Sequence, residues 1–575
     1  MNSPGYAASL PGASAAAAAV PAHAGAQASW ILGPRRDLLF IVAAPLLVLV
    51  LALALFGWRG AATATSVILL THVVMTVAHH LPTFIRVYGD VELFRRHKWT
   101  FVLAPLLPFG FAMAVLTYIN LKGYPVENIL YLFIVLALWD PWHFLMQHYG
   151  FTRIYDRHSG APPQLAARMD LLLSACCFIA IMLLCGDWLP SILEDLYVTA
   201  DLPLLMLMPA GMIATMEHLA VVAAIAAGGA YAFYLLHGLR RGWRISGIKL
   251  ALYASFFAVM YLAYTPNAWM QSWAPGWSFK VGFAVVGIVH MTQYLAIVWH
   301  YNRNLARHEG RARPGLFARL HARGGWWIGA AYVALCLAYG ALLSGQHDAR
   351  WPMSVLLALG FTSTLLHYYF DGFIWKVRHQ QNRENLDMPQ AASGGEASWW
   401  CHGKPRTPSA VLLRQALYFG VPMLVLTVGA IGVWQRPNAG YVGYMLQAHV
   451  LNEEGRVDEA ARLAEQALAT MTRQLPLAER LAELQPSASR DAELAFLVHD
   501  HARYERLLLP TLRGQAVSVD ARRQYRLEIE RAITWLERAL ARPGTPAHPG
   551  RETLSADDVR HVIEVWRREA AAIDS

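Results

Sequence analysis

The chain has 575 residues, of which 56% are hydrophobic and only 15% are charged, and its formal net charge is +9. An ordinary soluble domain has about 25% charged residues, so this composition excludes a wholly soluble chain and indicates an integral membrane protein. Because Lys and Arg gather in alternate loops between apolar stretches, the positive charge needs no nucleic-acid partner to explain it.

The N-terminal stretch is rich in Ala, Pro, Gly and Ser and has no Lys or Arg before Arg35. A cleavable signal peptide carries a basic segment ahead of its apolar core. We therefore interpret residues 1–34 as a disordered N-terminal extension.

Residues 35–436 form the predicted membrane domain. A bilayer core of about 30 Å is crossed by a helix of about 20 apolar residues. Stretches of that kind recur at 37–57, 62–85, 99–121, 127–150, 168–190, 217–238, 246–265, 279–301, 326–344, 353–376 and 410–434. The sequence thus predicts an all-α, polytopic transmembrane helix bundle of about 11 spans, with 191–216 as an interfacial or re-entrant segment.

The loop charges predict an orientation for these spans. Cations cluster at 35–36, 86–98, 153–168, 240–249, 303–323 and 376–414, and the loops between these clusters are nearly free of them. Cytoplasmic loops carry the excess of Lys and Arg, so the N-terminus is predicted to be cytoplasmic. With an odd number of spans, the C-terminal region lies on the opposite face. The Ala- and Arg-rich composition favours a bacterial inner membrane, which would make that face periplasmic.

Residues 437–575 are predicted to form a soluble helical domain. The segment around Gly455, with Ala460, Ala464 and Ala467 on its second helix, resembles one tetratricopeptide unit. Further helices are expected at 491–513, 518–542 and 555–573. The region is either a docking surface for a protein partner or a helical cap with coincidental alanine spacing.

Four predicted spans carry ionisable side chains within the membrane, and such residues are costly in lipid. The spans are the second, fourth, eighth and tenth, which all run toward the cytoplasm, so their histidines share one half of the membrane. The candidate metal ligands are His72, His79, His80, His143, His148, His290, His300 and His367. Asp371 and Asp140 are the acids beside them, each a ligand or a partner that orients a histidine.

Helical spacing favours some of these residues over others. His72 and His79 share a face, as do His367 and Asp371. His143 and His148 lie about 140° apart on an ideal helix and meet only if Pro141 loosens it. His300 is about 15 Å from His290 along the helix and is the weaker candidate of the two. Gln293 and Tyr294 are possible partners of the ligands.

Imidazole with a little carboxylate suits iron, copper or zinc, and few thiols are present to hold an iron–sulfur cluster. HFLMQH (143–148), VAHHLP (77–82) and HYYFDGFIWK (367–376) resemble segments of the histidine-rich membrane di-iron oxygenases. These include desaturases, hydroxylases and the Brp/Blh-type carotene-cleaving enzymes. Thr76 stands where a full HxxHH box has its first histidine.

The resemblance implies two iron ions that act with O₂ on a C–H or C=C bond of a lipid or isoprenoid. It also implies a cytoplasmic electron donor, since no redox domain is evident in the chain. Two other classes stay open. Facing histidines could bind haem b in an electron-transfer protein, and a many-span transporter or glycosyltransferase could carry a helical-repeat domain.

Overall fold

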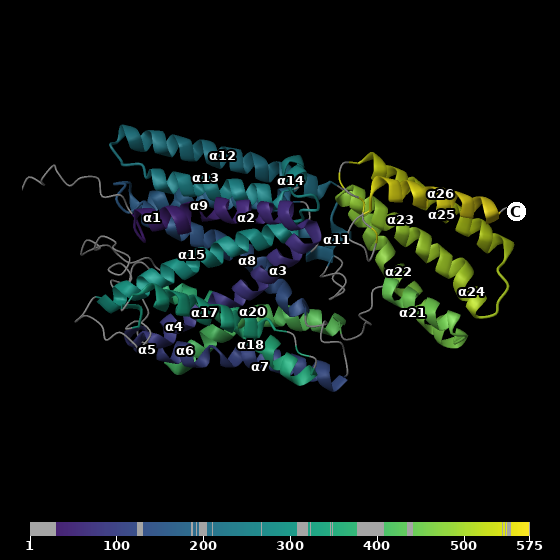
Figure 1. The fold of residues 1–575 in the computed structure, drawn as a ribbon, viewed down its shortest axis with the longest axis horizontal. Coiled ribbons are helices and arrows are strands. Elements are labelled where there is room, and N and C mark those ends of the chain that lie inside the picture. The colour runs from purple at the N-terminus through teal and green to yellow at the C-terminus, as the bar shows by residue number, and fades with distance from the viewer. Residues whose placement is uncertain are drawn as a thin grey trace, which may run out of the picture.

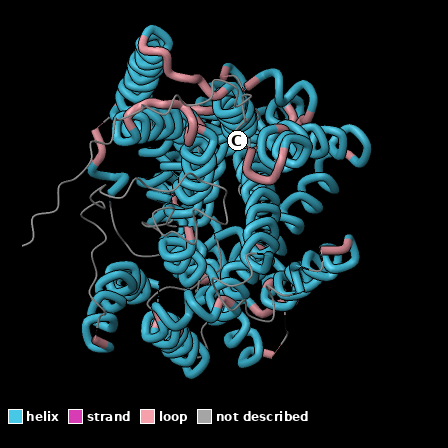
Figure 2. The backbone as a smooth tube through the Cα atoms, turned by 90° about the vertical axis from the view of Figure 1, so that its left-hand side faces the viewer, coloured by secondary structure: helices cyan, strands magenta, loops and turns pink. Residues whose placement is uncertain are grey.

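The computed structural model describes residues 30–122, 130–185, 188–190, 192–194, 204–209, 211–265, 267–307, 320–322, 324–345, 347, 349–375, 407–433, 441–542, 544, 546, 548 and 554–573. Within these ranges every regular element is a helix (Figure 2). The predicted all-α class is therefore confirmed for the described part of the chain. The predicted extension lies mostly outside it, but Ile31 and Leu32 are buried, and their amides donate to the carboxylate of Asp37.

Eight helical segments among the described residues are long and apolar enough to cross a membrane. They are Ala61–Gly89 (α3, Ala61–Ala78, with α4, His80–Gly89), Lys98–Leu121 (α6, Lys98–Leu103, with α7, Leu106–Lys122), Pro163–Leu184 (α9), Met212–Arg240 (α12), Gly247–Tyr264 (α13), Phe279–Ala306 (in α15, Phe279–Arg307), Trp326–Leu343 (α17) and Arg350–Gly372 (in α18, Arg350–Ile374). Each matches a predicted span. In Figure 1 these long helices run side by side along the horizontal axis.

The other three predicted spans also coincide with helices. The first is a bent pair, in which α1 (Pro34–Asp37) and η1 (Leu38–Val42) meet α2 (Ala44–Arg59) at 53°. The other two are α8 (Leu130–Tyr155) and α20 (Pro408–Val433). Short helices α5 (Val91–Arg96), α11 (Leu204–Leu207) and α14 (Ala268–Trp273) connect the long ones. The segment expected to be interfacial, 191–216, contains α11. Between 195 and 211 this is the helix that the structure describes.

The outer faces of the bundle are apolar. Leu51 on α2 and Ile225 and Phe233 on α12 expose 69–70% of their surface. Soluble proteins rarely expose large contiguous apolar surfaces, whereas a bilayer covers such side chains without cost. This surface agrees with an integral membrane protein.

Close helix contacts inside the bundle depend on glycine. A Cβ added at Gly340 on α17 would lie 2.2 Å from the Val74 carbonyl oxygen of α3. One added at Gly282 on α15 would lie 1.9 Å from the Ala263 carbonyl oxygen of α13. Small residues let membrane helices approach at backbone distance. Gly340 thereby brings α17 against α3, and Gly282 brings α15 against α13.

Some cations predicted to lie in loops are wholly or partly buried inside the bundle. Lys249 on α13 is 1% exposed, and its Nζ lies 2.9 Å from Asp156 and 3.2 Å from Asp170. Arg153 at the end of α8 also pairs with Asp170, at 2.5 Å. Arg86 on α4 is 2% exposed. These residues connect helices instead of facing solvent in loops. Their positions in the sequence therefore locate the ends of the membrane spans less accurately than expected.

The last helices lie together beyond the right-hand end of the bundle, opposite to α1 (Figure 1). They are α21 (Tyr441–Glu453), α22 (Val457–Leu484), α23 (Ala488–Arg503), η3 (Tyr504–Leu508), α24 (Leu509–Leu512), α25 (Val519–Ala541) and α26 (Ala556–Ile573). Gly455 turns the chain with φ 76°, and Ala464 and Ala467 pack in one cluster with Tyr441, as a tetratricopeptide-like helix pair requires.

Among the described residues, α22 contacts α11 and α12 of the bundle. Leu477 and Leu481 of α22 pack with Leu205 and Ile213. Arg490 of α23 donates to Glu194 at 3.2 Å.

Candidate metal centre

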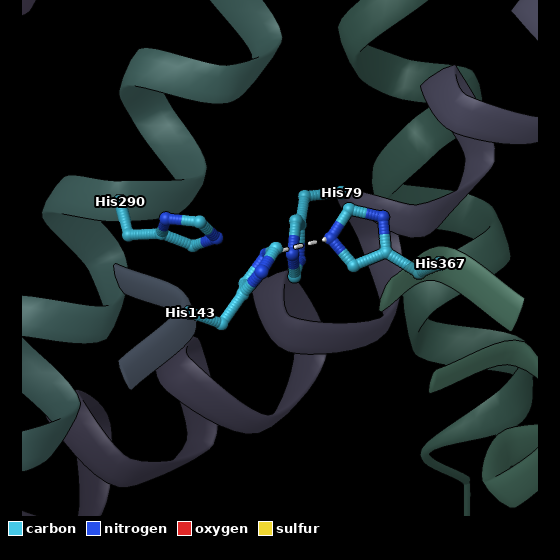
Figure 3. A group of neighbouring side chains, drawn as sticks. All are labelled: His79, His143, His290 and His367. Atoms are coloured by element: carbon cyan, nitrogen blue, oxygen red, sulfur yellow. Dashed lines mark hydrogen bonds between the residues drawn. The ribbon is translucent and has the colours of Figure 1, made fainter. Parts of the chain in front are cut away.

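Four of the eight predicted histidines meet inside the bundle (Figure 3). His79 comes from the junction of α3 and α4, His143 from α8, His290 from α15 and His367 from α18. One ring nitrogen of each lies within 4.8 Å of one ring nitrogen of every other. We call this set the four-histidine cluster. It could hold a metal ion.

Pro82 accounts for the position of His79. Proline has no N–H to complete the helical hydrogen bond to the carbonyl of Ala78, and its ring crowds that carbonyl. The helix accordingly breaks at His79, which adopts φ −75° and ψ −8°. The His79 Nδ1 lies 3.3 Å from the Met75 carbonyl oxygen. An Nδ1–H that donates to this carbonyl leaves the Nε2 lone pair available to a metal.

The closest pair in the cluster is His143 and His367. Their Nε2 atoms are 3.1 Å apart. Nitrogen ligands about 2.0–2.1 Å from one ion are about 3.0–3.4 Å apart when adjacent and about 4.2 Å apart when opposite. The spacing of this pair already suits one coordination shell. No two of the four ligand nitrogens are more than 4.8 Å apart. A small inward movement of the side chains would therefore bring all four to coordination distance of one ion.

Unpartnered ring nitrogens surround the same place. Both nitrogens of His290 and the Nε2 of His79 are buried without a hydrogen-bond partner. A buried polar atom left without a partner costs about 1–3 kcal/mol, and such atoms in native proteins call for an explanation such as a bound ion. This nitrogen-rich set of donors fits a transition metal of the iron, copper or zinc type.

One carboxylate adjoins the cluster. The Asp371 Oδ2 lies 3.9 Å from His143 Nε2 and 3.8 Å from His367 Nε2. Its Oδ1 accepts a hydrogen bond of 2.7 Å from Tyr294. Asp371 is therefore placed both to approach a metal and to be oriented by a phenol, as its spacing from His367 suggested.

His80 lies beside the cluster without belonging to it. Its Nδ1 is 3.0 Å from the Ser363 hydroxyl, and its ring stacks on His367 with centroids 4.8 Å apart. Its Nε2 is buried and has no partner. It is thus a further nitrogen donor beside the four-histidine cluster.

His72, His148 and His300 are not brought to the cluster. His72 sits against Gly287, and its ring meets Phe283 edge-on. His148 stacks on Phe256 with centroids 3.6 Å apart, and its Nδ1 lies 3.0 Å from the Phe144 carbonyl. His300 pairs with Asn304 on its own helix. α8 continues as one helix through Pro141, so His148 stays on a different face from His143.

Tyr294 donates to Asp371, as its predicted role beside the ligands suggested, whereas Asp140 and Gln293 have other roles than expected. Asp140 accepts a hydrogen bond from Tyr368 and not from a histidine. Gln293 donates to the Ile41 carbonyl and accepts from Gln147. Both tie neighbouring helices together around the cluster.

Sequence reasoning missed Thr83 and Tyr368. Thr83 Oγ1 lies 2.8 Å from His367 Nδ1, and the Tyr368 ring packs on His143 with centroids 4.8 Å apart. Thr83 follows His79 by four residues, which places both on one helix face. This four-residue spacing could have identified Thr83 as a neighbour of the site from the sequence.

A buried cation, Arg86, lies near the site. The Arg86 guanidinium stacks 3.4 Å from the Tyr301 ring centroid and 5.0 Å from that of Trp375, and it donates to the Ile374 carbonyl. Trp375 in turn packs edge-on against Tyr294. A row of aromatic rings therefore leads from Arg86 to the cluster.

No family model, curated protein or solved structure matches the chain. Its function is therefore inferred from the geometry of the four imidazoles and their neighbours.

Proposed function

We propose that the chain is a membrane-embedded, metal-dependent oxidoreductase that acts with O₂ on a C–H or C=C bond of a lipid or isoprenoid. The observation that carries this proposal is the convergence of His79, His290 and His367, from three helices apolar and long enough to cross a membrane, with His143 of α8. Ionisable groups in such helices are costly unless they serve a site.

Iron is the proposed metal. Non-haem iron oxygenases bind their metal through imidazoles and carboxylate. Metals that prefer thiolate ligands are a poorer match for this set of donors. The four-histidine cluster supplies four donors, and His80 and Asp371 add two more, enough for the pair of ions that we propose. Bound iron would supply the activation of O₂. Copper and zinc are the alternative metals, and elemental analysis of the purified protein would distinguish them from iron.

The chain's own residues hold the donors and exclude water. His290 and His367 are 0% exposed and His79 is 2% exposed. The side chains of His143 and Asp371 keep 12% and 14% exposure. An apolar substrate would therefore approach the cluster on the side of α8 and α18, while the rest of the site stays dry.

Haem b fits the same residues less well. The ring centroids of His79, His143, His290 and His367 lie 4.5–5.1 Å apart in four pairs. This spacing leaves no room for a porphyrin plane between the two rings of any of these four pairs. It favours direct binding of metal ions by the imidazoles.

The proposed topology has eleven spans, with α8, α20 and the bent pair α1–α2 added to the eight described above. The N-terminus would be cytoplasmic and the C-terminal helices periplasmic, which agrees with the positions of α1 and α21–α26 at opposite ends of the molecule (Figure 1). A cytoplasmic one-electron carrier would reduce the metal, and the C-terminal helices could bind a protein partner.

A turnover assay tests the proposal. The full chain, reconstituted in vesicles made from lipids of a strain that lacks it, would receive iron, O₂ and a chemical reductant. We expect O₂ uptake together with a hydroxylated or newly unsaturated lipid detected by mass spectrometry. His143→Ala and His367→Ala should abolish both signals, and His300→Ala, on α15 but away from the cluster, should retain them. Equal lipid products from wild type and His367→Ala would refute the proposal.

A further inference from the structure

A buried chain of hydrogen bonds joins two of the proposed metal ligands through residues that have no place in the metal shell. His367 Nδ1 is 2.8 Å from Thr83 Oγ1, which is 2.6 Å from Tyr294 Oη, which donates to Asp371 Oδ1 at 2.7 Å. Thr83 and His367 are 0% exposed and Tyr294 is 2% exposed. Helices α4, α15 and α18 each contribute to this chain.

The protons in this chain can be ordered in only one way when Asp371 is ionised. A carboxylate only accepts, so the single Tyr294 proton is donated to Asp371. The Tyr294 oxygen must then accept the single Thr83 proton. Thr83 has no proton left for His367, and its oxygen accepts the Nδ1–H of the imidazole. His367 is thereby held as the Nδ1–H tautomer, with the Nε2 lone pair directed at His143 Nε2.

We propose that Thr83 and Tyr294 are positioning residues that fix the tautomer of His367 and couple it to Asp371, so that both ligands are oriented together. This inference rests on the proposed metal site. Histidine ligands usually donate their second N–H directly to a carboxylate or carbonyl, and loss of such a partner weakens metal binding about 10–100-fold. Here a hydroxyl and a phenol stand between the histidine and the carboxylate.

The chemistry of the relay requires a hydroxyl at position 83 that donates and accepts at once. Valine has nearly the shape of threonine but neither function, so Thr83→Val breaks the chain in place. Thr83→Ser restores the hydroxyl. Tyr294→Phe keeps the ring that packs on His367 but leaves Thr83 free to point its proton either way, so its effect should be smaller.

Thr364 offers a matched control. It is also a buried helical threonine, at 7% exposure, and its hydroxyl donates to the Gly360 carbonyl of its own helix. Thr364→Val therefore makes the same chemical change on α18, three residues from His367, without touching the relay.

The test is a titration of the metal-stripped full-length protein in detergent with Co²⁺ alone, followed by visible absorption. We expect Thr83→Val to weaken Co²⁺ binding about 10–100-fold, with Thr83→Ser and Thr364→Val within about threefold of wild type. The double variant Thr83→Val/Tyr294→Phe should be no weaker than Thr83→Val, because one break already interrupts the chain. A purely structural role for Thr83 would instead shift the metal-free unfolding temperature and leave the Co²⁺ spectrum unchanged.

The outcomes separate the two proposals. Wild-type affinity in Thr83→Val overturns the relay and leaves the metal site standing, whereas no Co²⁺ binding by wild type overturns both. If Thr83→Val fails to fold, Tyr294→Phe decides, because unchanged affinity and an unchanged spectrum in that variant contradict the coupling of His367 to Asp371.

Discussion

Gly340→Ala should weaken the proposed metal site through the backbone of a neighbouring helix. A Cβ at position 340 would lie 2.2 Å from the Val74 carbonyl oxygen and 2.9 Å from the Cβ of Ala78. To reach ordinary contact distance, α17 and α3 must separate by about 1 Å, because packed backbones cannot compress. Ala78 directly precedes His79, so part of this displacement reaches the ligand.

The stability and the affinity should respond differently to that change. Overpacking costs about 1–3 kcal/mol, and the better helix propensity of alanine returns about 1 kcal/mol. The metal-free protein should therefore lose no more than about 2 kcal/mol. Metal–ligand distances tolerate only about 0.2 Å, so we expect at least a tenfold loss of metal affinity in a competition assay with a chromophoric chelator.

Gly329→Ala is the control for this experiment. It lies on the same helix, and its added Cβ would meet nothing closer than the Trp299 ring at 3.8 Å. Its metal affinity should equal that of wild type. Wild-type affinity in Gly340→Ala, or an equal loss in Gly329→Ala, would refute the reasoning.

Three further predictions concern other parts of the chain. Lys249→Met removes one of the two cations that Asp156 and Asp170 share, and Arg153 remains. The protein should lose about 3 kcal/mol, the low end of the cost of breaking a buried ion pair; adding Asp170→Asn should recover part of this loss, and a loss below about 1 kcal/mol would contradict the network. Pro82→Ala restores the N–H missing at the α3–α4 break, so it should lower metal affinity without lowering the unfolding temperature, and unchanged affinity would show that the break does not position His79. In the C-terminal helices, burial alone would lower the pKa of His499, but two neighbouring carboxylates outweigh burial and raise that pKa above 6.5. The hydrogen bond from His499 lowers the pKa of Glu569 from 4.5 to about 2. The stabilisation from Glu569 is lost as pH falls from 4.5 toward 2, and that from His499 is lost as pH rises through its raised pKa. The amide protection factors in α23 and α26, which are exchange rates relative to an unstructured chain at the same pH, should therefore be highest between pH 4.5 and 6.5. His499→Gln should remove the loss at high pH, and an unchanged profile would contradict the pairing.

The convergence of the four histidine-bearing helices could be predicted from the sequence. Loop charges placed the second, fourth, eighth and tenth spans parallel, and parallel spans bring residues at similar depth to one level. His79, His143, His290 and His367 do meet. The helix–turn–helix around Gly455 was equally accessible, because a glycine turn and buried alanines have a short-range signature.

The rotation of each helix could not be predicted from the sequence. Which face of α8 meets the cluster depends on helices far away in the chain, so His148 faced Phe256 although it lies only five residues from His143. The separation of His80 from the four-histidine cluster could not be predicted either, because its partner Ser363 is 283 positions away. Buried cations were misplaced for the same reason, since only the fold brings carboxylates to Lys249.

X-ray absorption at the metal edge of the purified full-length protein tests the central claim most directly. We predict bound iron with a first shell of nitrogen and oxygen at about 2.0–2.2 Å, and scattering from about two to three imidazole rings per iron, the average expected when five imidazoles bind two ions. The ring scattering should fall together with the metal content in His290→Ala, since both nitrogens of that buried ring have no protein partner. A protein without bound metal after growth in iron-, copper- and zinc-replete medium, or a shell without imidazole, would contradict the claim.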